Sequence, residues 1–165
     1  MGGSAAQPEG EASQIQFRLS GMDVNDFSFD SEPEHTNFEQ GGYLLQHALT
    51  ASEDDNLILV RVRATLQSVL EDGDGTGDKV NVGSVSVTGS FEIRNLEERE
   101  DSEGDIQLPN EFVANLLGIV ISTVRGVLLA HGSGTPIEKN PLPIINPLHL
   151  IESTDYVEHE ESPQT

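Results

Sequence analysis

The chain of 165 residues contains no cysteine and carries 29 acidic against 8 basic residues, which gives a formal net charge of −21. Without cysteine it can form no disulfide, thiolate metal site or thiol nucleophile. The negative charge repels phosphate, which argues against nucleic acid and anionic membranes as partners. The acidic residues are spread along the chain, and this favours the acidic, halophilic surface of a protein in a salt-rich cytosol over docking to a basic partner.

We expect one domain with two tails. Residues 1–13 lack periodicity and are rich in small and polar residues, which predicts a disordered leader. They show no basic region followed by an apolar run, so we expect no secretory signal and a cytoplasmic location. Patterned sequence covers residues 14–152, and the acidic stretch 153–165 is predicted to be a disordered tail.

The first half of the chain favours extended structure. Apolar residues alternate with polar ones from Ile15 to Ser20, which predicts a half-buried strand. A loop with a short extended stretch, 26–30, follows this strand. A second strand is predicted over residues 43–50, after a pair of glycines that indicates a turn or bulge.

Two longer segments, 57–70 and 80–93, predict an antiparallel hairpin. In the first of them Arg61 and Arg63 alternate with valine and alanine, so the charged and apolar side chains should lie on opposite faces.

A long helix is predicted next, with Pro109 in its first turn and Gly132 just past its end. It is apolar almost all the way round, so it needs cover on every side, and we expect its own sheet on one side and a second copy on the other. Asn115 and Arg125 near its middle argue against a membrane span. The predicted oligomer is a dimer of dimers. Its predicted interface residues are Val113, Leu117, Val120, Val124 and Leu128.

No group of residues indicates catalysis or metal binding. Asp72 and Asp74 resemble the start of a calcium loop, but Gly83 stands where such a loop needs a carboxylate. The histidines lack the spacing of metal ligands, and we expect Arg125 to satisfy a backbone contact or an ion pair. The sequence therefore predicts a protein that is not an enzyme and needs no cofactor.

The aromatic residues suggest a binding surface instead. Any one of them is more often part of a core, but together they could line an apolar groove for extended, non-native chains. The residues predicted to form this client-binding groove are Phe27, Phe29, Phe38, Tyr43, Leu45 and Phe91. Further along, Asn146 and Pro147 predict the N-cap and first residue of a short second helix.

Three segments together resemble the SecB-type export chaperones. VNDFSFDSEPEHTNF is similar to that family's acidic and aromatic stretch before a His-x-Phe motif. Gly89, Phe91 and Ile93 match its Gly-x-Phe-x-Ile strand. In the third segment Arg125 matches the helix arginine, GT at 134–135 the Gly-Thr pair, and LPIIN at 142–146 the motif after it.

The resemblance implies an α+β fold, in which a four-stranded antiparallel sheet has a long helix and a short C-terminal helix packed on one side. It implies two subunits joined along their sheets, with dimers meeting through the long helix. The implied function is ATP-independent holding of unfolded polypeptides or preproteins for the SecA export motor. This chain lacks the family's cysteine-containing tail, so the alternatives are a toxin-antitoxin-associated SecB-like chaperone and an oligomeric adaptor for a single folded partner.

Overall fold

The computed structural model describes residues 14–29, 36–52, 55–70 and 77–152, and for 36–41 and residue 70 it describes the backbone alone. The predicted leader and tail lie outside the described residues. So do Asp72 and Asp74 of the segment that resembles a calcium loop.

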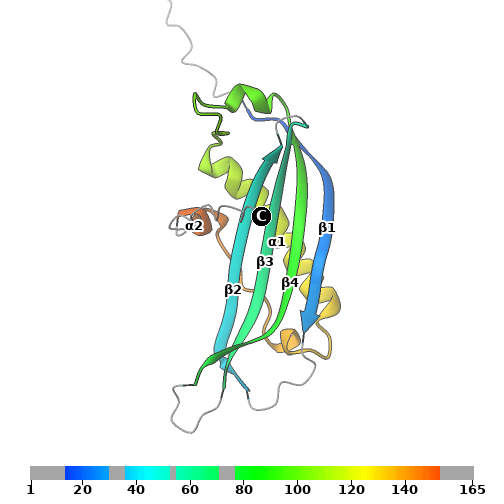
Figure 1. Cartoon of the computed structure of the whole chain (residues 1–165). Helices are drawn as coiled ribbons and strands as arrows, with labels where there is room; N and C mark the ends of the chain where they lie inside the picture. Colours follow the sequence, from blue (N-terminus) through cyan, green and yellow to red (C-terminus); the bar gives the residue numbers. More distant parts are fainter. Residues whose placement is uncertain (1–13, 30–35, 53–54, 71–76, 153–165) are drawn as a thin grey trace, which may run out of the picture.

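Four antiparallel strands form one open sheet in the order β1-β4-β3-β2. The strands are β1 (Phe17–Phe29), β2 (Thr36–Ser52), β3 (Leu57–Leu70) and β4 (Lys79–Ile93). Figure 1 shows the sheet as a long curved layer, with the helices on one side of it. The predicted α+β fold and the hairpin of β3 and β4 are therefore confirmed, and β1 and β2 are the two edges of the sheet.

The strand β1 is longer than the sequence pattern indicated. Its pairing with β4 shifts register twice, between Leu19 and Gly21 and between Val24 and Asp26. Each bulge inserts one residue, so the alternation of apolar and polar side chains changes phase along the strand. Because of these shifts the sequence pattern predicted two separate extended pieces, 15–20 and 26–30. The two bulges divide β1 into three stretches, and the apolar residues of all three share one face of the strand.

The core lies between the helix side of the sheet and α1 (Asn110–His131). The alternation predicted for β3 is confirmed, because Val60 and Val62 are fully buried while Arg61 and Arg63 are exposed on the other side. The helix contributes its own buried stripe to this core: Phe112, Leu116, Leu117, Val120, Ile121, Val124 and Leu128.

Gly89 sets how closely α1 approaches the sheet. A Cβ atom at this position would lie 2.8 Å from Cε2 of Phe91 and 2.8 Å from Cγ2 of Val120. Both of these side chains have no exposed surface. The missing side chain therefore lets the helix rest directly on β4.

The segment after the helix follows the predicted pattern. Gly132 ends α1 in the position expected from the sequence; a Cβ there would collide with the carbonyl oxygen of Leu128. Short 3-10 helices, η1 (Leu96–Arg99) and η2 (Pro136–Lys139), flank the long helix in the chain.

The second helix, α2 (Pro147–Glu152), begins at the predicted N-cap. The backbone N–H of Leu148 donates to Oδ1 of Asn146 at 3.1 Å. The helix α2 contacts α1 on the same side of the sheet, as Figure 1 shows.

Candidate functional surfaces on the edge strand and beside the long helix

The aromatic residues predicted to form one groove lie at opposite edges of the sheet. Across the strands, Phe27 is in register with Val85, Ala64 and Leu45, and Phe29 is in register with Gly83, Leu66 and Tyr43. The pairs therefore occupy neighbouring rows on the helix side, but β4 and β3 separate them. Three strand spacings amount to roughly 14 Å, so a single narrow groove does not contain both pairs.

Two further predicted groove residues have other positions. Phe91 is 0% exposed, and the prediction that it lines a binding groove is wrong, because its ring faces α1 in the centre of the core. Phe38 lies within β2, but its side chain is outside the described residues. Sequence reasoning missed Phe17, whose ring meets those of Phe91 and Phe112 edge to face at 6.1 and 5.5 Å.

On the β2 side, Tyr43 anchors the segment that follows α1. Its hydroxyl donates a hydrogen bond to the carbonyl oxygen of Asn140 at 2.7 Å. Burial raises the pKa of Tyr43 to about 12, so the phenol keeps the proton that it donates to a higher pH than an exposed tyrosine does. His47 lies on the same face of β2, and burial lowers its pKa, which favours the neutral imidazole. These contacts are structural, and Tyr43 is half-buried.

On the opposite edge, β1 presents an apolar surface. We call the exposed residues Phe17, Leu19, Val24 and Phe27 the β1 strip; their exposed fractions are 41%, 46%, 51% and 37%. Their partners in β4 all point toward the helix, so the four side chains lie on the helix side of the edge strand. The strip therefore borders the core and is open to solvent along its length.

The two ends of the β1 strip contact the two ends of α1. Phe17 meets Phe112 in the first turn of the helix. The ring of Phe27 lies 5.1 Å from that of Phe29 and 5.5 Å from the imidazole of His131, the last residue of the helix. These contacts hold the strip in place although its outer surface is uncovered.

Charged residues of β1 lie on the other side of the sheet. Arg18 donates to Glu92 at 2.6 Å, and Asp26 lies 3.9 Å from Arg63. The helix side of β1 thus keeps its apolar character in a protein with a net charge of −21.

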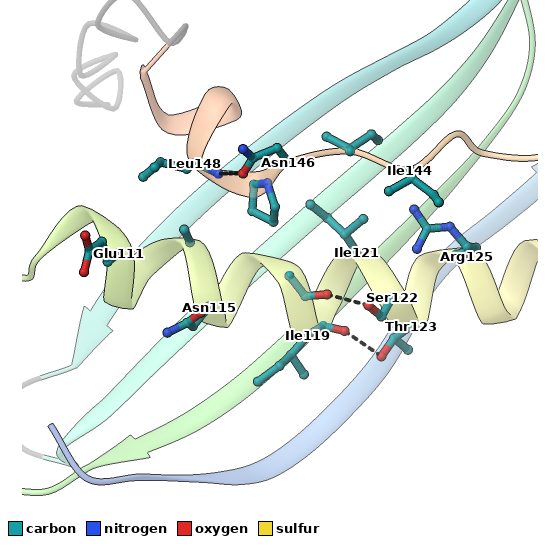
Figure 2. A pocket seen from close by; sticks show the side chains of 14 residues that line it. Glu111, Asn115, Ile119, Ile121, Ser122, Thr123, Arg125, Ile144, Asn146 and Leu148 are labelled. Atoms are coloured by element: carbon teal, nitrogen blue, oxygen red, sulfur yellow. Dashed lines mark hydrogen bonds between the residues drawn. The ribbon is translucent and has the colours of Figure 1, made fainter. Parts of the chain in front are cut away.

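A second open surface is a groove of about 910 Å³ beside the outer side of α1 (Figure 2). Its walls come from the helix and from the segment that leads into α2. Ile144, at its border, is 94% exposed. The lining residues are Glu111, Ala114, Asn115, Gly118, Ile119, Ile121, Ser122, Thr123, Arg125, Ile144, Ile145, Asn146, Pro147 and Leu148.

The arginine and the two hydroxyl groups that line this groove already have partners. Nη2 of Arg125 donates to the carbonyl oxygen of Pro143 at 2.8 Å, which confirms the expected backbone contact. Ser122 and Thr123 donate to backbone carbonyl oxygens one turn earlier in the helix, at 2.7 and 3.1 Å, as Figure 2 shows. The groove thus offers no free cation and no activated hydroxyl.

The residues predicted to join subunits lie mostly in the core. Leu117, Val120, Val124 and Leu128 are at most 1% exposed within one chain, and Val113 is partly buried. The prediction that Leu117, Val120, Val124 and Leu128 form an oligomer interface is wrong, because the most apolar stripe of α1 faces its own sheet. The solvent side of the helix carries smaller and more polar residues, with Leu129 as its exposed apolar exception at 65%.

By length and composition alone, α1 could cross a membrane, since its mean hydropathy reaches 2.0. The structure places the buried stripe of this helix in the core between the helix and the sheet, although only 39% of the apolar window is buried. Arg125, whose charge argued against insertion, holds the chain that follows the helix.

Within the described ranges, no three histidine or acidic side chains lie close enough to hold a metal ion. Among the carboxylates that the structure describes, that of Asp101 in the acidic loop accepts several hydrogen bonds. It accepts backbone N–H bonds from Asp105 and Glu103 and a side-chain bond from Gln107, and these bonds lower its pKa. Asp101 therefore orders a turn, and it does not point into a site.

Comparisons with known proteins add little to this geometry. No family model and no curated protein matches the chain. Among solved structures, a protein of unknown function from Streptococcus agalactiae is 17% identical, with a TM-score of 0.28, over 79% of this chain and 97% of that chain. A TM-score this low carries no argument about fold or function.

Proposed function

We propose that this protein holds non-native polypeptides without ATP, and that the β1 strip is a principal contact surface for them. The observation that carries the proposal is the gathering of four exposed apolar side chains on one face of an edge strand. Proteins that are soluble and monomeric seldom expose contiguous apolar surface without a binding role. The sequence resemblance to the SecB-type chaperones supports the same function.

The size of this surface suits weak and sequence-tolerant binding. Full burial of a large apolar side chain contributes about 1.5–3 kcal/mol, and the strip residues are already about half covered. Each should therefore add about 1 kcal/mol when a client covers it. Several such contacts retain an unfolded chain without selecting one sequence, and the chain can be released without a nucleotide.

The test is suppression of aggregation. The purified protein should delay the aggregation of several unrelated denatured proteins in buffer without ATP. Changing Leu19 and Val24 together to serine should weaken this protection several-fold. The melting temperature should fall by a few degrees only, since the covered half of each side chain contributes about 1 kcal/mol to folding. Leu129→Ser is the matched control, since it removes an exposed leucine elsewhere and should leave protection intact. Undiminished protection by the double variant would show that the β1 strip is not the contact surface.

The range of protected clients separates the alternative functions. Protection of a single folded partner would indicate an adaptor, and protection of one antitoxin above all others would indicate a toxin-antitoxin chaperone. Binding of the loaded protein to the SecA motor would support the export role. Failure to protect any denatured protein would contradict the holding function itself.

A further inference from the structure

The other edge of the sheet differs from β1 in charge. Between Gly42 and Ser52, β2 contains no Asp, Glu, Lys or Arg, although the whole chain carries 29 acidic side chains, and burial favours the neutral form of its histidine, His47. The strand β1, in contrast, carries Arg18, Asp23 and Asp26. Charged residues on an edge strand oppose the addition of further strands, and this protection is missing from residues 42–52 of β2.

The edge of β2 is also regular. Its pairing with β3 runs residue by residue from Gly42–Gln67 to Ser52–Leu57 with no change of register. In β1 two bulges interrupt the ladder. Bulges twist an edge away from a straight partner, so β2 offers the longer unbroken row of backbone donors and acceptors.

That row is free within the described part of the chain. No backbone hydrogen bond joins residues 42–52 to any described segment outside the sheet. The side chains beside it are accessible on both faces of the sheet: Leu44 on the polar face is 44% exposed, and Leu49 on the helix face is 36% exposed.

We infer that the edge of β2 binds an extended, uncharged, apolar polypeptide segment as a fifth strand of the sheet. This inference rests on the proposed holding function and names how a client is bound. Backbone hydrogen bonds supply the contact common to all sequences, and alternate client side chains reach Leu44 on one face and Leu49 on the other.

The charge of the protein favours such a client over a second copy of the chain. Two copies joined at this edge would bring two bodies with a net charge of −21 together. The edge itself carries no charge, but a net charge of this size on each body opposes the approach of two copies. An uncharged client segment adds no such repulsion.

The decisive probe is a labelled apolar peptide as long as residues 42–52, made in three forms. One form is unmodified, and the other two carry N-methyl groups on one or the other set of alternate residues. An added strand uses the N–H groups of every second residue only. One methylated form should therefore bind about tenfold more weakly or worse, and the other should bind like the parent. Equal affinity of the two methylated forms would overturn the inference.

Variants of the protein locate the contact. Ala48→Lys and Thr50→Lys place a lysine on the exposed edge strand. Each should weaken the binding of the unmodified peptide several-fold and leave the melting temperature of the protein unchanged. Leu129→Lys is the control on α1 and should bind like the wild type. If the β2 variants bind the peptide normally, the edge of β2 is not its site.

Other results separate the two proposals. If the wild type protects denatured proteins but binds the two methylated peptides equally well, the fifth-strand inference fails and the holding function stands. If it protects nothing, both fail. If sedimentation shows a dimer that Ala48→Lys splits, the occupant of this edge is a second copy, and the inference is overturned.

Discussion

Replacement of Gly89 by alanine tests how α1 rests on the sheet. The new methyl group would lie 2.8 Å from both Cε2 of Phe91 and Cγ2 of Val120. Carbon atoms in contact normally stand about 3.5–4.0 Å apart, so at least one neighbour must move. Both neighbours are fully buried, and neither has free space on a solvent side.

The expected loss of stability follows from this crowding. Overpacking a core costs about 1–3 kcal/mol, and the gain from replacing glycine by alanine within a strand offsets about 0.5–1 kcal/mol of it. We expect Gly89→Ala to lower the free energy of unfolding by about 1–2 kcal/mol. For a domain of this size the melting temperature should fall by about 2–8 °C, as measured by circular dichroism with urea titration as a second readout.

Gly126→Ala is the matched control. A Cβ at Gly126 meets nothing within 4 Å, and the residue is an exposed position inside α1. Alanine there should raise stability by about 0.5–1 kcal/mol through helix propensity. In a Val120→Ala background, Gly89→Ala should lower the free energy of unfolding by less than it does in the wild type, because one of the two crowded atoms, Cγ2 of Val120, is gone. A Gly89→Ala protein as stable as the wild type would refute the close contact between helix and strand.

Three further predictions concern pH and salt. Burial raises the pKa of Tyr43 to about 12 from 10.0, so the contribution of the protonated phenol to the free energy of unfolding should be complete below pH 10 and be lost as the pH rises through about 12. In a Tyr156→Phe protein the absorbance of the phenolate should show this late titration. A midpoint near 10 would contradict it. Burial lowers the pKa of His47 from 6.5, so the free energy of unfolding should fall as the pH drops below 6.5 and through the pKa of His47 in the folded protein. The NMR resonance of this imidazole, assigned with a His47→Gln variant, should titrate below pH 6.5. A higher midpoint would contradict the burial of His47. Because a net charge of −21 produces self-repulsion, the melting temperature should rise from low to molar salt, and a flat profile would show that the acidic groups are compensated within the fold.

The sequence predicted the elements whose patterns are local. Alternation identified β3 and β4 and the faces of Arg61 and Arg63, because side chains on a strand point to opposite sides in turn. Proline and glycine bounded α1, and Asn146 marked the start of α2. The bulges of β1 were not predictable in this way, since each one shifts the phase of the alternation on which the prediction depends.

The candidate site was predicted only in part, because it depends on strand order. Phe29 and Tyr43 were assigned to one groove because the aromatic residues together could line such a surface, but β1 pairs with β4 and β2 pairs with β3. Of the predicted groove residues, Phe27 belongs to the exposed β1 strip, while Phe91 is in the core. The regular outer edge of β2 becomes evident only when the register of the whole sheet is known.

By itself the sequence determined the amphipathic strands and the apolar character of the long helix, because each depends on residues within a few positions of one another. Its resemblance to the SecB-type chaperones implied the α+β class. The tertiary structure decided which stripe of that helix is covered. A helix that is apolar on most sides fits a sheet in several orientations, and the observed one places Val120 over Gly89, where the missing side chain allows the closest packing. That choice put Leu117, Val124 and Leu128 inside the core and left the edges of the sheet as the apolar surface open to a partner.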